Sequence, residues 1–162
     1  MGGLLTWANM LFLWIFGDNL EDRMGHLRYL VFYLICGILA SLAHVITTAL
    51  LSAAPVAGAP SALLIPSLGA SGAISGVMGG YILLFPGRRV TVFMLRFLTQ
   101  VPAWVAIGLW FGFQLINGLG MLGDSSQQGG VAYAAHIGGF IAGLALIKFF
   151  TFGRSRSTSL PS

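Results

Sequence analysis

Charged side chains are scarce in this sequence, and their scarcity excludes an ordinary soluble domain. Of the 162 residues, 7% are charged and 57% are apolar, whereas soluble domains carry about 25% charged residues. Only four residues are acidic, against eight that are basic. A chain with so few charges has too little polar surface to cover its apolar side chains in water. The composition therefore indicates a protein that lies in a membrane.

Cysteine is also nearly missing, and Cys36 is its single instance. One cysteine excludes an intramolecular disulfide and a cysteine-based metal cluster. The three histidines include no pair at the i, i+4 spacing of a helical zinc site, and no carboxylate lies near His136 in the sequence. We therefore predict no metal site. The pI near 9.9 reflects the loops between apolar runs, so we predict no nucleic-acid partner.

Long apolar runs are what the sequence has in place of charge. A run of roughly 20 apolar residues crosses a hydrocarbon core of about 30 Å as a helix. Five candidates occur, at about residues 4–17, 27–51, 68–85, 98–119 and 130–150. We predict an all-α membrane protein, a bundle of about five transmembrane helices over residues 1–150. The polar segment 151–162 is predicted to be a disordered tail.

The loops between these runs predict an orientation. The basic residues are Arg23, Arg28, Arg88, Arg89, Arg96, Lys148, Arg154 and Arg156. If the five runs alternate in direction, all eight lie on one face, which the positive-inside rule assigns to the cytoplasm. The C-terminus is then cytoplasmic and Met1 is outside. Because no signal peptide follows Met1, we expect that an upstream span is missing from this chain.

The stretch 69–80, "GASGAISGVMGG", places two hydroxyl groups in an apolar region. Polar groups are costly in hydrocarbon and usually face a bundle interior or a water-filled cavity. Helical patterning from Ser71 onward puts this serine near a helix N-terminus, where unpaired N–H groups and the macrodipole favour negative charge. An oxyanion would be stabilised there. Taken alone, however, Ser71 fits an N-cap or a small packing residue better than a catalytic group.

Small residues recur every four positions in two of the runs. We assign helix packing to Gly72, Gly76 and Gly80 in the first run and to Gly139 and Gly143 in the second. Small residues at this spacing let helix backbones approach closely in a membrane. If the two faces pack together, His136 comes within reach of Ser71. A serine hydroxyl needs a base within about 3 Å to become a nucleophile. His136 could provide it, although a histidine near a helix end can also be structural.

Three motifs together resemble a known family. These are "NMLFLWIFGDNLEDRMG", "GASGAISG" and "AHIGGFIAG", in this order along residues 1–148. The chain resembles a rhomboid intramembrane serine protease of the bacterial type. The resemblance implies a bundle of six core helices with a Ser/His dyad in a water-filled cavity open to the outer face. The first of these helices would be missing here. It also implies a multi-pass protein of the bacterial cytoplasmic membrane.

The resemblance assigns roles to individual residues. Ser71 matches the nucleophile and His136 the general base. Gly69 matches a glycine whose loop helps to form the oxyanion hole, and Asn9 an asparagine whose amide donates to the oxyanion. Four residues before Asn9, the family pattern has a histidine where this chain has Leu5. One oxyanion donor is therefore missing.

The predicted function is that of an intramembrane serine endopeptidase that cleaves transmembrane protein substrates without cofactor or metal. Its partners would be these substrates and the lipid bilayer. The missing donor and the missing helix favour an alternative, a catalytically impaired relative that binds transmembrane segments without cleaving them. A small transporter or channel is a third reading. It is opposed by the lack of intramembrane charge and of two similar halves.

Overall fold

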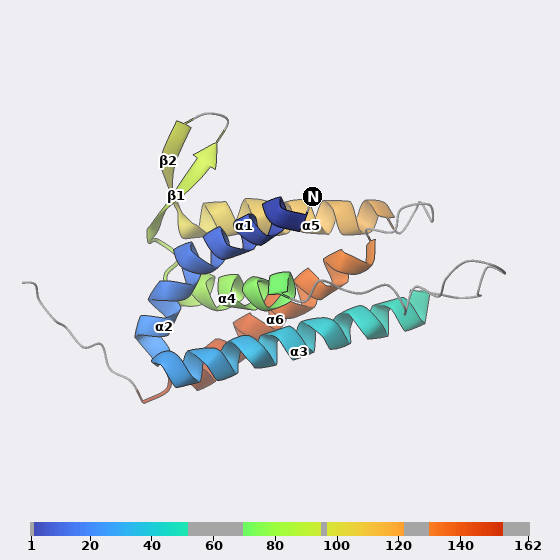
Figure 1. Cartoon of the computed structure of the whole chain (residues 1–162), viewed down its shortest axis with the longest axis horizontal. Coiled ribbons are helices and arrows are strands. Elements are labelled where there is room, and N and C mark those ends of the chain that lie inside the picture. The colour runs from blue at the N-terminus through green and yellow to red at the C-terminus, as the bar shows by residue number, and fades with distance from the viewer. Residues whose placement is uncertain (1, 52–69, 95–96, 122–129, 154–162) are drawn as a thin grey trace, which may run out of the picture.

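The glycine-rich run forms a helix, α4 (Ala70–Leu84), that other helices enclose. The computed structural model describes residues 2–51, 70–94, 97–121 and 130–153. In it, every residue from Gly72 to Tyr81 is buried. Figure 1 shows α4 in the middle of the bundle. A helix that is buried on all sides must be free of charge on all sides, which the run from Gly72 to Tyr81 is.

Two long helices pack most extensively on α4. They are α3 (His26–Leu51) and α6 (Gly130–Thr151). A Cβ atom added at Gly139 would overlap the carbonyl oxygen of Gly72, and one added at Gly143 would overlap the carbonyl oxygen of Gly76. The backbones of α4 and α6 are therefore in direct contact, with no side chain between them at these positions.

The glycines of α4 also face α3 and the C-terminal part of α6. A Cβ atom at Gly76 would lie 2.7 Å from the sulfur of Cys36, and one at Gly80 would lie 2.9 Å from Cδ1 of Ile147. Cys36 and Ile147 are fully buried. Glycine at these positions thus makes room for larger buried side chains of the neighbouring helices, which fill the bundle interior to the density of a protein core.

The first apolar run continues beyond its predicted end. It forms α1 (Gly2–Phe12), a π-helical turn η1 (Leu13–Gly17) and α2 (Asp18–Met24), without a break in the helical backbone. Hydropathy marked only residues 4–17, because α2 contains the polar sequence "DNLEDRM". Gly25, with φ of 85°, ends α2 and turns the chain into α3.

A β-hairpin precedes the fourth predicted span, and the sequence did not predict it. Strand β1 (Arg89–Met94) pairs in antiparallel register with β2 (Phe97–Pro102), and α5 (Ala103–Met121) follows directly. The predicted start of this span at residue 98 was therefore wrong. Residues 98–102 mix apolar and polar side chains, Val and Thr favour strands, and the segment "RVTVFM" provides a partner strand.

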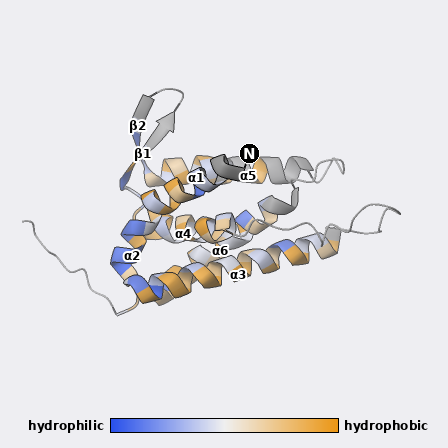
Figure 2. Cartoon of the chain, viewed as in Figure 1, coloured by the Kyte–Doolittle hydropathy of each residue, from blue (hydrophilic) through white to orange (hydrophobic). Residues whose placement is uncertain are grey.

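The predicted fold class, a helical bundle of a membrane protein, is confirmed, and the short hairpin is an addition to it. Two of the described helices are long and apolar enough to cross a membrane, over His26–Leu50 and Tyr133–Thr151. Two shorter apolar segments are Ala70–Leu84 and Ala103–Gly112. The count of about five spans stays a prediction. Large apolar side chains are exposed along α3, as suits contact with lipid, and Figure 2 colours much of this helix as hydrophobic.

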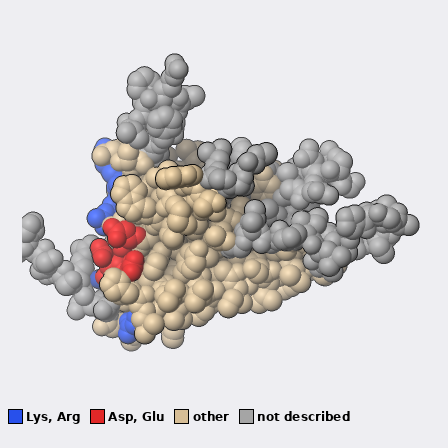
Figure 3. Space-filling model, in the orientation of Figure 1, with Lys and Arg blue, Asp and Glu red and all other residues tan. Residues whose placement is uncertain are grey.

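The described charges gather at one end of the bundle, as Figure 3 shows. Acidic and basic residues of α2 lie there, together with Arg28 in the first turn of α3, Arg88 and Arg89 after α4, and Lys148 near the end of α6. We call this the charged end. Asp124, Arg96, Arg154 and Arg156 lie outside the described residues, as does the predicted tail from residue 154 onward.

The contact between α4 and α6 predicts a strong effect of one methyl group. In Gly143→Ala the new Cβ would overlap backbone atoms of Gly76, so the helices must separate. We expect the protein to lose about 1–3 kcal/mol of stability, measured as a fall in Tm of the purified protein in detergent. The matched control is Gly108→Ala, because nothing lies within 4 Å of a Cβ at Gly108. There the better helix propensity of alanine should leave Tm unchanged or raise it. Equal effects of the two substitutions would contradict the packing described here.

Candidate active site

Ser71 and His136 come from different helices and lie in the geometry of a nucleophile and its base. Nε2 of His136 lies 2.9 Å from Oγ of Ser71. This is an ordinary hydrogen-bond length. Both residues are half-buried. Serine belongs to α4 and histidine to α6, so the pair depends on the glycine-mediated contact between these two helices.

Ser71 is the second residue of α4. The N–H groups of the first helical turn have no partners within the helix, so they can act as hydrogen-bond donors to a negatively charged atom near Ser71. One turn further, the buried Ser75 donates a hydrogen bond from Oγ to the carbonyl oxygen of Ser71, at 2.8 Å. Ser75 is thereby satisfied within its own helix and does not compete for His136.

Ser71 lies far from the charged end. Thirteen residues separate it from Leu84, where α4 ends before Arg88 and Arg89. At 1.5 Å per residue the helix covers about 20 Å over this distance. His136 likewise lies three helical turns before Lys148 on α6. The candidate site thus belongs to the half of the bundle that is opposite the charges.

The imidazole of His136 has no carboxylate behind it in the part of the chain that is described. Its Nδ1 atom is buried and has no hydrogen-bond partner there. Two aromatic rings flank it instead. Trp110 of α5 lies with its ring centroid 5.9 Å from that of His136, and Tyr133 of α6 lies edge-on at 6.4 Å. These contacts limit the orientations that the imidazole ring can adopt.

The sequence did not single out Trp110 or Tyr133. Tyr133 stands three residues before His136 on one helix, so helical spacing could have indicated the contact. No sequence signal connects Trp110 to His136, because the two belong to different helices. The rings beside His136 come from α5 and α6.

Of the two predicted oxyanion residues, the structure describes Asn9 but not Gly69. Asn9 is half-buried in α1, and α1 packs on α4. Leu5 belongs to the same helix, one turn earlier. Gly69 lies outside the described residues, as do the flanking segments 52–69 and 122–129. The water-filled cavity that the family resemblance implies stays a prediction for this reason.

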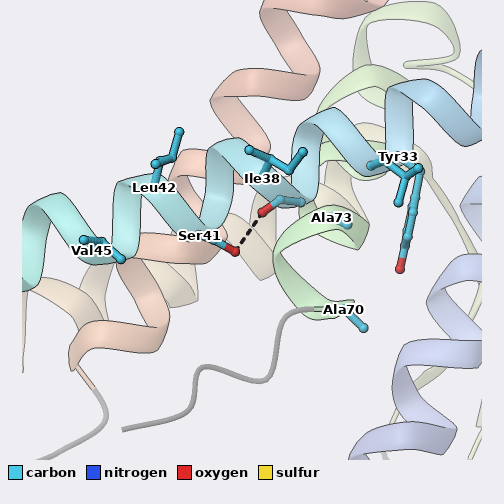
Figure 4. Close-up of a pocket in the computed structure, with 9 residues that line it drawn as sticks. Tyr33, Ile38, Ser41, Leu42, Val45, Ala70 and Ala73 are labelled. Atoms are coloured by element: carbon cyan, nitrogen blue, oxygen red, sulfur yellow. Dashed lines mark hydrogen bonds between the residues drawn. The ribbon is translucent and has the colours of Figure 1, made fainter. Parts of the chain in front are cut away.

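A groove of about 490 Å³ runs along α3 beside the start of α4 (Figure 4). Its walls are apolar apart from Tyr33 and Ser41, and it reaches Ala70 and Ala73. Ser41 donates its hydroxyl hydrogen to the carbonyl oxygen of Gly37, at 3.0 Å. Ser71 and His136 do not line this groove. It therefore offers an apolar surface and not a second reaction centre.

The arrangement of Ser71 and His136 is suited to acyl transfer. Nε2 can accept the hydroxyl proton of Ser71 while Nδ1 carries the other ring proton. The N-terminal turn of α4 supplies N–H groups on the side of the serine. Among the described residues no three His, Cys, Asp or Glu side chains are grouped in a way that could hold a metal ion.

Comparison with known proteins agrees with these motifs. The family model of the rhomboid domain matches residues 5–152. Rhomboid protein 1, mitochondrial, from Saccharomyces cerevisiae is 33% identical over 136 residues, 84% of this chain and 35% of that protein. The rhomboid protease GluP of Bacillus subtilis is 32% identical over 138 residues, 85% of this chain and 22% of that protein.

The chain spans about a third of the length of the yeast relative and about a fifth of that of the Bacillus relative. No solved structure matches it significantly. The family model nevertheless covers nearly the whole bundle, from α1 to the residue after α6. This chain therefore belongs to the rhomboid family, and it is an integral membrane protein of that family.

Proposed function

We propose that this chain is an intramembrane serine endopeptidase in which Ser71 is the nucleophile and His136 the general base. The observation that carries the proposal is the 2.9 Å contact between Oγ of Ser71 and Nε2 of His136. Membership of the rhomboid family and the similarity to a protein named as a rhomboid protease support it. The substrates are transmembrane proteins, cleaved without metal or cofactor.

The reaction begins when His136 accepts the hydroxyl proton of Ser71 and Oγ attacks the carbonyl carbon of the scissile peptide bond. The developing oxyanion is stabilised by N–H groups at the start of α4, by Gly69 just before it in the sequence and by the amide of Asn9. His136 then gives its proton to the leaving nitrogen as the C–N bond breaks. A water molecule, deprotonated by His136, hydrolyses the acyl-enzyme and restores the serine.

The charged end sets the proposed orientation. We place it, with the C-terminus, on the cytoplasmic side of a bacterial membrane, because basic loop residues are retained there. Ser71 and His136 then lie toward the outer leaflet, about 20 Å from the charged end by the length of α4. Cleavage near the outer surface of the membrane follows from this placement.

One observation favours the second candidate function, a relative that binds transmembrane segments without cleaving them. Leu5 occupies the position of an oxyanion donor and cannot donate a hydrogen bond. Loss of one such donor lowers turnover by about 10²- to 10³-fold. The proposed enzyme would accordingly be slow, whereas in the binder Ser71 would not react, and covalent labelling distinguishes the two.

A fluorophosphonate should label the protein at Ser71. Oγ displaces fluoride and forms a P–O bond, while His136 takes the hydroxyl proton. We expect labelling of the wild type and none of Ser71→Ala or His136→Ala, read as the mass increase of the intact protein. Ser41→Ala is the matched control, because Ser41 bonds only within α3, and it should label like the wild type. A folded wild type that does not label would contradict the protease and leave the binder.

Removal of the ring beside His136 should slow the reaction without unfolding the bundle. In Trp110→Ala the imidazole loses a neighbour at 5.9 Å, and a small displacement of a catalytic group costs about 10- to 100-fold in rate. The labelling rate should fall by this amount while Tm changes by a few degrees, and Trp110→Phe should recover most of it. Trp104→Ala, which removes an exposed ring from the same helix, should keep the wild-type rate. An unchanged rate in Trp110→Ala would show that Trp110 does not position His136.

The role of Asn9 can be tested on turnover. Asn9→Ala should lower the rate at which a transmembrane substrate is cleaved in liposomes by about 10²- to 10³-fold, because one oxyanion donor is removed. Asn19→Ala is the control, since the Asn19 amide bonds to the carbonyl of Ile15 within the helix. It should change turnover by no more than about threefold. Equal turnover in the wild type and Asn9→Ala would remove Asn9 from the mechanism.

A further inference from the structure

A surface pocket of about 600 Å³ lies where α3 begins and α6 ends, at the charged end of the bundle. It combines two cations with three aromatic rings. Its lining residues are Arg28, Lys148, Phe149, Phe150 and Phe152. The candidate active site makes no use of it, because Ser71 and His136 belong to the opposite half.

The walls of the pocket are fixed by contacts between the two helices. Phe150 packs edge-on against Phe32 of α3, with ring centroids 5.5 Å apart, and against Phe149 at 5.6 Å. Nη1 of Arg28 donates a hydrogen bond to the carbonyl oxygen of Phe152, at 3.1 Å. The first turn of α3 is thus tied to the turn that ends α6. Phe150 and Arg28 are thus held in place by contacts between α3 and the end of α6.

The two cations of the pocket lack acidic partners. In residues 2–51, 70–94, 97–121 and 130–153 neither Arg28 nor Lys148 forms an ion pair, whereas Glu21 pairs with His26. No acidic residue lines the pocket. A guanidinium group has five N–H donors, and the bond to Phe152 uses one of them. The remaining donors and the ammonium group of Lys148 are complementary to an anion.

The aromatic rings indicate that this anion carries an apolar chain. Phe149 is 77% exposed and Phe152 is 83% exposed, directly beside the cations. A soluble anion would leave these rings uncovered, whereas an amphiphile would cover the rings and neutralise the charges together. Because the charged end marks the edge of the hydrocarbon core, phospholipid headgroups are present at this depth. Basic pockets between helices on the cytoplasmic side bind such headgroups.

We propose that this pocket binds one anionic phospholipid. Its phosphate accepts hydrogen bonds from Arg28 and Lys148, and an acyl chain lies along Phe149 and Phe152. The site rests on the proposed cytoplasmic placement of the charged end and not on protease activity.

The test is lipid retention by the purified full chain in neutral detergent, with phosphatidylglycerol as the probe and native mass spectrometry as the readout. We expect Arg28→Gln/Lys148→Gln to weaken binding by at least about tenfold, at roughly 1 kcal/mol per cation. The matched control is Arg88→Gln/Arg89→Gln, which removes the same charge from the same end but outside the pocket. Its binding should stay within about twofold of wild type. Phosphatidylcholine, which carries no net charge, should bind the wild type and both double variants more weakly than phosphatidylglycerol binds the wild type.

Equal loss of lipid binding in the two double variants would overturn the proposal, because it would show that the lipid is attracted to the charged end as a whole and not to this pocket. Displacement of the lipid by millimolar inorganic phosphate would also overturn it in favour of a free-anion site. Arg28→Gln removes the bond to Phe152, so the double variant could fail to fold. Lys148→Gln alone breaks no described contact, and it should weaken binding by about fivefold. Unchanged binding in a folded Lys148→Gln protein would contradict the proposal.

Discussion

The close contact between the backbones of α4 and α6 is the constraint on which the rest of this structure depends. Carbonyl oxygens of Gly72 and Gly76 face Gly139 and Gly143 with no room for a Cβ atom between them. In a membrane, where helices gain little from the hydrophobic effect, such contact provides the packing energy that holds them together. The same contact fixes the rotation of each helix about its axis. It therefore determines that Ser71, directly before Gly72, and His136, three residues before Gly139, face each other.

Because helix packing brings Ser71 and His136 together, it can also orient the imidazole without a carboxylate. In a triad, a carboxylate orients the histidine and fixes its tautomer. Here Nδ1 has no partner among the described residues, so the ring must be oriented by what surrounds it. Trp110 and Tyr133 lie against the imidazole from two helices. The positioning of the proposed base is thus a property of the bundle, and it should be as sensitive to helix packing as to changes in the site itself.

Much of this arrangement could be predicted from sequence, and the limits have physical reasons. Glycines at intervals of four indicated that two helices meet, and a helix of known pitch then placed Ser71 and His136 on the meeting faces. Hydropathy failed where its signal is ambiguous. Residues 98–102 belong to β2 and not to a helix, and the polar α2 continues the first helix. Trp110 was beyond prediction, because which side of α5 faces His136 depends on tertiary packing alone.

The hydrogen bond between Ser71 and His136 can be observed directly by nuclear magnetic resonance of the protein in bilayers, with ¹⁵N-labelled histidine. The structure predicts that neutral His136 carries its proton on Nδ1, and that its unprotonated Nε2 resonance shifts when Ser71 is replaced by alanine. The resonances of His26 and His44 should stay in place. An Nε2-protonated His136, or a spectrum that Ser71→Ala leaves unchanged, would contradict the account.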